Sequence, residues 1–551
     1  LLMFWMYRTF KSIIIPIILI GITIQVTYGA LGYLDVTYNA LLSAIPGILL
    51  AICIADSVHI LTSIHHYKAE GFNPRQALLM SLTKNLQPTL LTSISTTISF
   101  FSITLTDIQP VSDLGLTAGI GTLFAWFFTY FFLGGLYSFL TKGEISTPCI
   151  YYKDDTGEED KAIVSKVFAR NATEWVNKYK SWIVGIFILK LIATVLIALT
   201  GEVNSDPMKY FGENVPIRKN YDFTATKMNG MRGIDLVIDS EKEEGIKSPE
   251  FLKKVDAFSK WLESEPEVTN TKSALDIIKK MHQTLNNDDP KFHSIPDKQE
   301  TVAEVLFLYQ MGLPQGMDLN NQISIDNRKL RYRVIWNIET SKESEAKSKY
   351  ILEKAPEFGL NVDTGGNVPI YIQMNTQVVK SFFSSMTMAI GLVSLLLLFV
   401  FKDLFLAMLA MFPNIIPLTL GAAVMAIFGI YIDIGTSMVC SVCLGIAVDD
   451  TIHFVSSYKN YRSNGLDAYE AVIETFSITG KALVSTTLLL VVGFGVFIFA
   501  DFVPNRNFGI FCSIILLYAL ITDLLFLPAL LLQFDSKRKS GKNIEATLSE
   551  A

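Results

Sequence analysis

Long apolar stretches dominate the chain, and each is close to 20 residues in length. An α-helix rises about 1.5 Å per residue, so about 20 apolar residues cross a hydrocarbon core about 30 Å thick. The pattern therefore predicts ten membrane spans, which we place at residues 12–31, 41–65, 89–105, 114–140, 182–200, 378–400, 404–427, 435–458, 482–500 and 508–534. Residues 1–6 are expected to be the end of a further span.

One long polar segment, residues 201–376, interrupts this pattern. Within it, strict alternation of apolar and polar residues predicts strands, and an apolar period near 3.6 predicts amphipathic helices. On this basis we expect strands at residues 233–239, 332–338, 360–362 and 368–373, helices at 249–263 and 344–355, and a turn at 364–366. Strands that alternate with helices predict an α/β domain built as an open-faced sandwich.

Basic residues mark one set of span ends in both halves of the chain, at Lys11, residues 66–88, Lys142, Lys402, residues 459–481 and the tail. The positive-inside rule places these ends at the cytoplasmic face, which leaves the polar segment outside the cytoplasm. The charged stretch before residue 182 predicts an amphipathic helix at 163–179 that lies along the cytoplasmic face. The expected organisation is a first bundle (1–142), a cytoplasmic linker (143–181), a single span (182–200), an extracytoplasmic domain (201–376), a second bundle (377–535) and a basic cytoplasmic tail (536–551).

Composition agrees with a polytopic α-helical membrane protein. Half of the 551 residues are hydrophobic, only 18% are charged, and mean hydropathy is +0.38, values that soluble domains do not reach. No basic stripe interleaved with aromatic residues is present, so we expect no nucleic acid partner. Four of the five cysteines lie in apolar spans, where a free thiol is usually a small packing group, and the pair Cys440 and Cys443 has no second pair to complete a metal site.

The two bundles repeat each other. Sliding the chain by 394 positions places Asp56 on Asp450, His59 on His453 and Thr92 on Thr486, and no gap is needed over about a hundred residues. Because both halves have the same orientation, we expect parallel duplicated transmembrane bundles related by an axis along the membrane normal. A complete first repeat would need roughly 210 further residues, so we expect the N-terminal part of that repeat to be missing from this sequence.

The candidate chemistry lies inside these spans. Asp449 and Asp450 are adjacent in an apolar run, with Asp450 roughly 22 Å along the helix from Gly435, and His453 follows within one turn. In the first half Asp56 and His59 keep the same spacing. Ionisable residues at this depth are rare and usually mark an ion or proton pathway. Two adjacent carboxylates in a low dielectric cannot readily both be ionised, so at least one should hold a proton.

Each of these residues could instead have a purely structural role. The acids could form a polar network that only fixes helix packing, and the histidines could be hydrogen-bond donors at a helix interface. Depth and duplication favour a proton relay made of Asp449, Asp450, Asp56, His453 and His59. Thr92 and Thr486 begin the next span in each half and could support the carboxylates by donating hydrogen bonds, although they could equally be packing groups.

Motifs for other chemistry are missing from the sequence. It has no Gly-x-x-x-x-Gly-Lys-Ser/Thr loop, which excludes that form of nucleotide site as the energy source, and no Gly-x-Ser-x-Gly or zinc-protease motif. We therefore expect a protein that is not an enzyme and that needs neither cofactor nor metal.

The whole pattern resembles the resistance-nodulation-division (RND) superfamily, and within it the MMPL-type exporter branch, which is related to hopanoid and mycobacterial lipid exporters and to Patched and Dispatched. The residues that carry the resemblance are 206–211, 364–366, 445–453, 493–494, 508–509 and 527–528. The resemblance implies proton-driven export of hydrophobic or amphipathic molecules, with Asp449, Asp450 and Asp56 in the relay. Multidrug pumps of the superfamily instead pair a double Asp in the first half with a lysine in the second, whereas this chain has the pair in the second half and a histidine in each.

We therefore expect an exporter of lipids or other hydrophobic molecules in a bacterial cytoplasmic membrane, with the soluble domain on the periplasmic side. Its expected partners are the substrate, protons, the membrane, a homo-oligomer (dimer or trimer) and a periplasmic acceptor protein. The alternatives are a lipid- or sterol-sensing receptor without net transport, a pump for small amphiphiles or drugs, and a force-coupling subunit that assists protein translocation. The motifs expected of the last are not apparent in the sequence.

Overall fold

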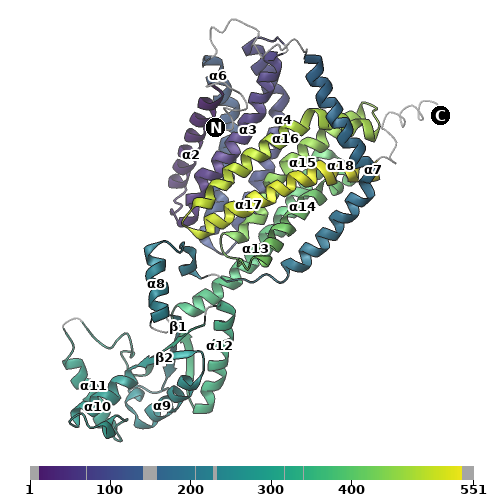
Figure 1. Cartoon of the computed structure of the whole chain (residues 1–551). Coiled ribbons are helices and arrows are strands. Elements are labelled where there is room, and N and C mark those ends of the chain that lie inside the picture. The colour runs from purple at the N-terminus through teal and green to yellow at the C-terminus, as the bar shows by residue number, and fades with distance from the viewer. Residues whose placement is uncertain are drawn as a thin grey trace. The chain divides into compact units, whose positions relative to one another are not determined.

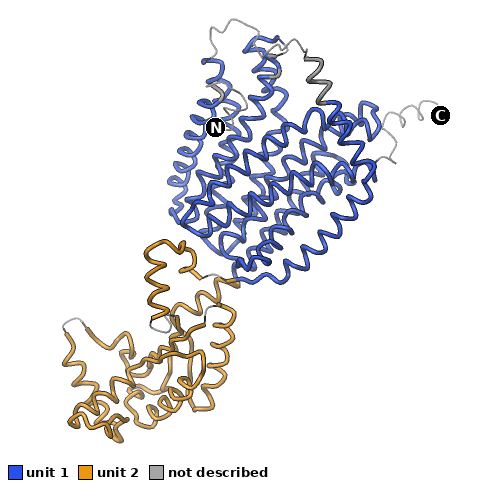
Figure 2. Tube along the Cα trace, viewed as in Figure 1, with its two compact units in different colours: residues 1–203, 377–551 blue, residues 204–376 orange. Residues whose placement is uncertain are grey.

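The computed structural model describes residues 11–69, 71–140, 158–204, 206–227, 232–314, 317–338 and 340–535, and it divides the chain into two compact units (Figures 1 and 2). Unit 1 comprises residues 1–203 and 377–551, and unit 2 comprises Asn204–Thr376. Unit 2 ends where the predicted soluble domain ends and begins at residue 204 rather than 201. The expectations for residues 1–6, for 143–157 and for the tail 536–551 lie outside the described residues.

Unit 1 is a helical bundle. Among the described residues, ten helices are long and apolar enough to cross a membrane, and each overlaps one of the ten predicted spans. Its helices in the first half are α2 (Lys11–Tyr33), α3 (Ile45–Ala69), α4 (Pro74–Ser102), α5 (Gln109–Phe128) and α6 (Gly134–Leu140). The remaining helices are α7 (Glu158–Ala198), α13 (Asn367–Phe401), α14 (Leu404–Ile427), α15 (Val439–Ser463), α16 (Ala468–Gly495), α17 (Val503–Ile521) and α18 (Leu527–Leu530).

Three helices extend further than expected. The predicted amphipathic helix at 163–179 and the span at 182–200 are one continuous helix, α7, so the prediction of a separate helix along the membrane face is wrong. Neither glycine nor proline separates the two predicted elements, so nothing ends the helix there. Likewise α4 and α16 begin well before their apolar cores, because Asn73 and Asp467 cap their first turns through the amides of Gln76 and Glu470.

Elements 394 positions apart have matching bounds. Helices α3 and α15 begin at Ile45 and Val439, and α4 and α16 begin at Pro74 and Ala468. Helices α3 and α15 are each followed by a glycine in the left-handed region, Gly71 at φ +94° and Gly465 at φ +95°. Glycine adopts this conformation without steric penalty. Matching bounds are what the predicted duplication requires.

Close contacts join the two halves of the bundle. Helix α15 packs along α4, and α16 packs along α3. Gly445 on α15 permits the first contact, because a Cβ atom there would lie 2.4 Å from Ser99 Cβ on α4. The equivalent contact on the other side joins Gly493 of α16 to Ala51 of α3, where the corresponding distance is 3.3 Å. Small residues therefore allow helices from opposite halves of the bundle to pack at a short interhelical distance.

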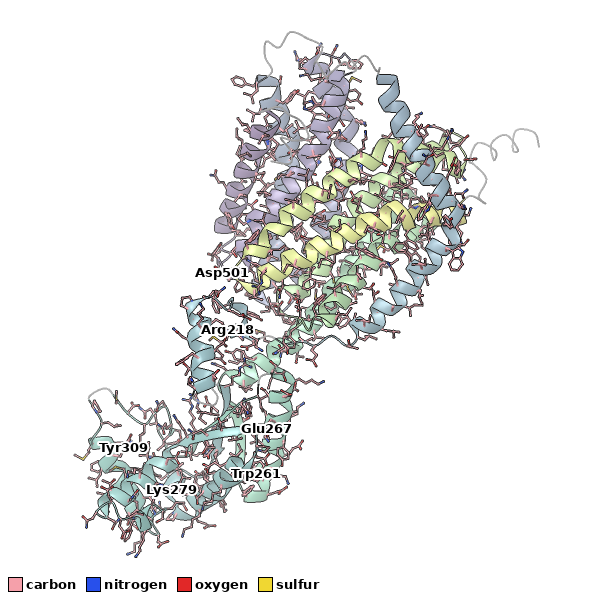
Figure 3. All side chains as sticks on the ribbon, viewed as in Figure 1. Arg218, Trp261, Glu267, Lys279, Tyr309 and Asp501 are labelled. Atoms are coloured by element: carbon pink, nitrogen blue, oxygen red, sulfur yellow. The ribbon has the colours of Figure 1, made fainter. Side chains whose placement is uncertain are left out.

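Unit 2 contains a four-stranded antiparallel sheet in the order β2-β3-β1-β4. Its strands are β1 (Arg232–Asp239), β2 (Val268–Ser273), β3 (Lys329–Trp336) and β4 (Asn361–Gly365), and its helices are α8 (Pro216–Lys227), α9 (Pro249–Ser264), α10 (Ala274–Leu285), α11 (Gln299–Met311) and α12 (Ser341–Lys354). Even-numbered residues such as Ile234, Leu236 and Val334 are fully buried with Phe258 of α9 in one core. Lys279 on α10 forms an ion pair with Asp256 on α9 (Lys279 is labelled in Figure 3).

Sequence patterns located some of these elements and missed others. The predicted strands at 233–239, 332–338 and 360–362 overlap β1, β3 and β4. The predicted strand at 368–373 is wrong: these residues form the first turns of α13, where Pro369 is tolerated near the helix start. Strand β2 and helices α10 and α11 were not predicted. The polar sequence of β2, Val-Thr-Asn-Thr-Lys-Ser, lies at an edge of the sheet and lacks an apolar alternation.

Gly445→Ala should destabilise the bundle by about 1–3 kcal/mol, because the added methyl overlaps Ser99 and neither helix can retreat freely. The matched control is Gly391→Ala on α13, where nothing lies within 4 Å of the added Cβ and the gain in helix propensity should stabilise by about 0.5–1 kcal/mol. Unfolding of the purified protein in detergent measures both. Equal stability of the two variants would contradict the close approach.

Candidate functional site

The candidate relay residues lie on α3 and α15. Asp56 and His59 are on α3, and Asp449, Asp450 and His453 are on α15, the most buried of the candidate spans. The structure brings four of them together: the carboxyl of Asp449 acts electrostatically on Asp56, and both histidines act on Asp449. Asp450 points to a different set of partners. The equivalent helices of the two halves therefore meet at the predicted site.

The two histidines stack on each other. Their ring centroids are 4.8 Å apart and the planes differ by 18°. His453 Nε2 also lies 3.3 Å from Asp449 Oδ1, one helical turn away, although the pair lacks the angles of a hydrogen bond. A proton added to His453 would therefore turn a close contact into an ion pair.

Several polar atoms in this cluster are buried without a hydrogen-bond partner among the described residues. They are Asp56 Oδ2, His59 Nε2, Asp449 Oδ1 and His453 Nε2. A buried polar atom left unpaired costs about 1–3 kcal/mol, so native structures rarely keep several in one place without a functional reason. A network that only fixed helix packing should satisfy its own hydrogen bonds. The described side chains of this cluster therefore do not form such a fully satisfied network.

The same residues include one grouping with the composition of a metal site. Ligand atoms of His59, Asp449 and His453 all lie within 4.8 Å of one another. The two rings lie in nearly parallel planes, so the in-plane nitrogen lone pairs of one ring do not meet those of the other at one point. A tetrahedral ion with metal–nitrogen distances of about 2.0–2.1 Å would need at least one ring to rotate. That no metal is needed stays a prediction.

Asp450 has a hydroxyl partner that the sequence did not single out. Thr487 Oγ1 donates to Asp450 Oδ2 at 2.7 Å. The predicted supporter, Thr486, instead donates to backbone carbonyls of its own helix, including Ala482 O at 2.9 Å, so that assignment is wrong by one residue. One residue turns a side chain by about 100° around a helix, which a pattern of repeated threonines does not resolve. Thr92 lies close enough to Asp449 to act on its carboxylate, and it also bonds to Thr89 O at 3.0 Å.

A further buried acid, Asp523, was missed. It lies in a π-helical turn, Thr522–Phe526, with 1% of its surface exposed. Thr451 Oγ1 donates to Asp523 Oδ1 at 2.8 Å, and Asn414 Nδ2 donates to Thr451 Oγ1 at 2.9 Å. Asp450 acts electrostatically on Asp523, so these two buried acids form one cluster. The sequence signal for Asp523 was the presence of an acidic residue inside the predicted apolar span 508–534.

A double-mutant cycle can test the assignment of Thr487. The cycle of Thr487→Val with Asp450→Ala should give a coupling of about 0.6–2 kcal/mol, because each variant removes the same hydrogen bond. The matched cycle of Thr486→Val with Asp450→Ala should give a coupling near zero, since the Thr486 hydroxyl bonds only within its own helix. Unfolding in mixed detergent measures both. A larger coupling at Thr486 would contradict the observed geometry.

Comparison with known proteins agrees with this architecture. The MMPL family model matches residues 245–543, and a model described as the sterol-sensing domain of SREBP cleavage-activation matches residues 10–147. A protein of Methanocaldococcus jannaschii, named only as a membrane protein, is 23% identical over 308 residues, which cover 53% of this chain and 73% of that protein. Since the first match covers more than half of the chain, and the chain has ten helices among the described residues that could cross a membrane, the protein belongs to the MMPL family of membrane proteins.

Proposed function

We propose that the protein is an exporter driven by the proton-motive force, which moves lipids or other hydrophobic or amphipathic molecules out of the cytoplasmic membrane. The observation that carries the proposal is the meeting of Asp56, His59, Asp449 and His453 between equivalent helices, with buried polar atoms that have no hydrogen-bond partner among the described residues. Family membership supports transport in general. The ion and the cargo are parts of the proposal.

The proposed coupling step is a change of charge at the contact of α3 with α15. A proton from the outer side would neutralise one carboxylate of the pair Asp449 and Asp450, or would charge His453 beside Asp449. Either event changes the electrostatic force between α3 and α15, whose histidine rings stack, and the low dielectric makes that force large. The hydrogen bonds from Thr451 to Asp523 and from Thr487 to Asp450 would keep these two carboxyl groups in position during the step.

Two helices could carry this change along the chain. Helix α13 runs without interruption from Asn367 to Phe401, so residues of unit 2 continue directly into a membrane span. Helix α7 likewise runs unbroken to Ala198, shortly before unit 2 begins. The proposal includes the parallel duplication of the bundles, the extracytoplasmic position of unit 2 in a bacterial inner membrane, a homo-oligomer and a periplasmic acceptor of the cargo.

A second candidate is a lipid- or sterol-sensing receptor without net transport. The match of residues 10–147 to a sterol-sensing domain favours it, since that stretch includes α3 with Asp56. A receptor needs the bundle to bind a lipid and change shape, but it does not need groups that cycle protons. The dependence of activity on the buried acids therefore separates the two functions.

Asp450→Asn should reduce gradient-driven lipid transfer at least tenfold, because the amide keeps the shape of the carboxyl but does not titrate near neutral pH. The full protein is reconstituted with lipids extracted from its source membrane. Mass spectrometry then measures the lipids that reach acceptor vesicles after a proton gradient is imposed. Asp56→Asn should behave in the same way.

The control is Asp35→Asn, an exposed residue at φ +56°, a conformation that asparagine also adopts readily. It should transfer lipid like the wild type. Transfer by Asp450→Asn at the wild-type rate would contradict proton-driven export. Retained lipid binding together with no gradient-driven transfer in any variant, wild type included, would favour the receptor.

A further inference from the structure

Unit 2 contains a pocket of about 380 Å³ on the face of its sheet opposite the core that includes Phe258 of α9. Odd-numbered residues of β1 and β3 form its floor, and these include Asp235, Arg331 and Arg333. Tyr221 of α8 and the first turns of α13, with Tyr371 and Ile372, form the walls. The volume falls within the range of small-molecule binding sites, about 300–1,000 Å³.

The charges on the floor do not balance. Asp235 accepts from Arg331 Nη2 at 2.7 Å and from Arg333 Nε at 2.9 Å, so two guanidinium groups share one carboxylate. Burial alone would raise the pKa of Asp235, but the hydrogen bonds and charges of the two arginines outweigh it and hold that pKa below its usual value. Asp235 is therefore ionised at neutral pH. The three residues together carry a net positive charge.

The third arginine of the pocket does not remove this excess. Arg232 is paired with Asp206 and also donates to the Tyr221 hydroxyl at 3.0 Å. Three guanidinium groups thus line the pocket with two carboxylates. Helix α13 begins at Asn367 in the pocket wall, and the start of a helix adds a partial positive charge. The excess of guanidinium groups over carboxylates and the helix start both favour the binding of an anion.

The arginines on the floor also remain accessible. Arg333 keeps 53% of its side-chain surface exposed and donates to Asp235 through Nε and Nη2, and its Nη1 donates to no described residue. A guanidinium has five N–H donors in a planar fork that suits carboxylate and phosphate. At the end of β1, Asp239 forms a one-to-one pair with Arg328, the residue just before β3, through two hydrogen bonds of 2.7 and 2.9 Å. The shared carboxylate is thus particular to the pocket.

Besides the polar residues Ser341, Ser344 and Asn367, the rest of the lining is largely apolar or aromatic and includes Met208, Ile335, Trp336, Val368, Tyr371 and Ile372. A small inorganic anion would leave this surface uncovered, whereas an amphiphile would cover it with its chain or backbone. Apolar walls with a few polar groups at one end are typical of sites that orient a ligand by its head. Charge and shape together specify an anion attached to an apolar group.

We propose that this pocket binds the anionic head of an amphiphile, a carboxylate or a phosphate ester, through Arg331 and Arg333, with its apolar part against Tyr371 and Ile372. The inference names a substrate class for the export proposed above, and it rests on that function only for the step from binding to transport.

Calorimetric titration of the full protein in phosphatidylcholine nanodiscs tests the proposal. The probes are octyl phosphate and octanoate, with octyl glucoside as a neutral molecule of the same chain length and inorganic phosphate as an anion without a chain. The two anionic amphiphiles should bind at least tenfold more tightly than either comparison probe. Equal binding of octyl glucoside, or equal binding of inorganic phosphate, would overturn the proposal.

Variants locate the site. Arg333→Gln should weaken the binding of octyl phosphate at least tenfold, whereas Arg328→Gln, which breaks a comparable pair outside the pocket, should change it less than twofold. Asp235→Asn removes the competing carboxylate and should tighten binding severalfold. If Asp235 served only to fold the pocket, the same variant would lose binding, and that result, like an unaffected Arg333→Gln, would overturn the assignment.

Binding needs no proton gradient, so it can fail independently of transport. Asp450→Asn should bind octyl phosphate like the wild type while losing gradient-driven lipid transfer. Intact transfer by Arg333→Gln with wild-type binding would overturn the pocket and leave the export function standing.

Discussion

Titratable side chains held in the middle of a membrane bundle are the constraint on which this protein depends. Water cannot solvate Asp56, Asp449, Asp450 or Asp523 there, so each must find a partner in the protein or hold a proton. Asp450 and Asp523 have threonine donors, at 2.7 and 2.8 Å. The cluster of Asp56, Asp449 and the two histidines keeps buried atoms unpaired within the described chain. The two groups of acids therefore differ in how far the protein satisfies their polar atoms.

The two halves contribute unequally to this arrangement. Helices α3 and α15 match in their bounds, and their histidines stack where the halves meet. The acids do not match: at the offset of 394 positions, Asp449 corresponds to Ala55 and Asp523 to Thr129. Duplicated helices thus supply a common frame, and the second half adds most of the charge. The acids are therefore distributed asymmetrically between helices whose bounds match.

The sheet of unit 2 uses its two faces in different ways. One face packs against helices through Ile234, Leu236 and Val334, and this burial holds the unit together. On the opposite face, Asp235 of β1 and Arg331 and Arg333 of β3 form the floor of the pocket. Because strand residues alternate in direction, every second position was free to carry charge without any loss from the core. The excess positive charge of the pocket follows from this separation.

Local patterns in the sequence located the ten helices that could span a membrane and the acids buried within them, because apolar length and burial of charge in a membrane leave few alternatives. They also located β1, β3 and β4. Three features depended on tertiary structure. The rotation of α16 decided that Thr487 rather than Thr486 reaches Asp450, and helix continuity turned residues 368–373 from an apparent strand into the start of α13. Packing of distant segments paired Arg331 and Arg333 with Asp235, because partners 96 and 98 residues apart meet only when β1 and β3 have found their register.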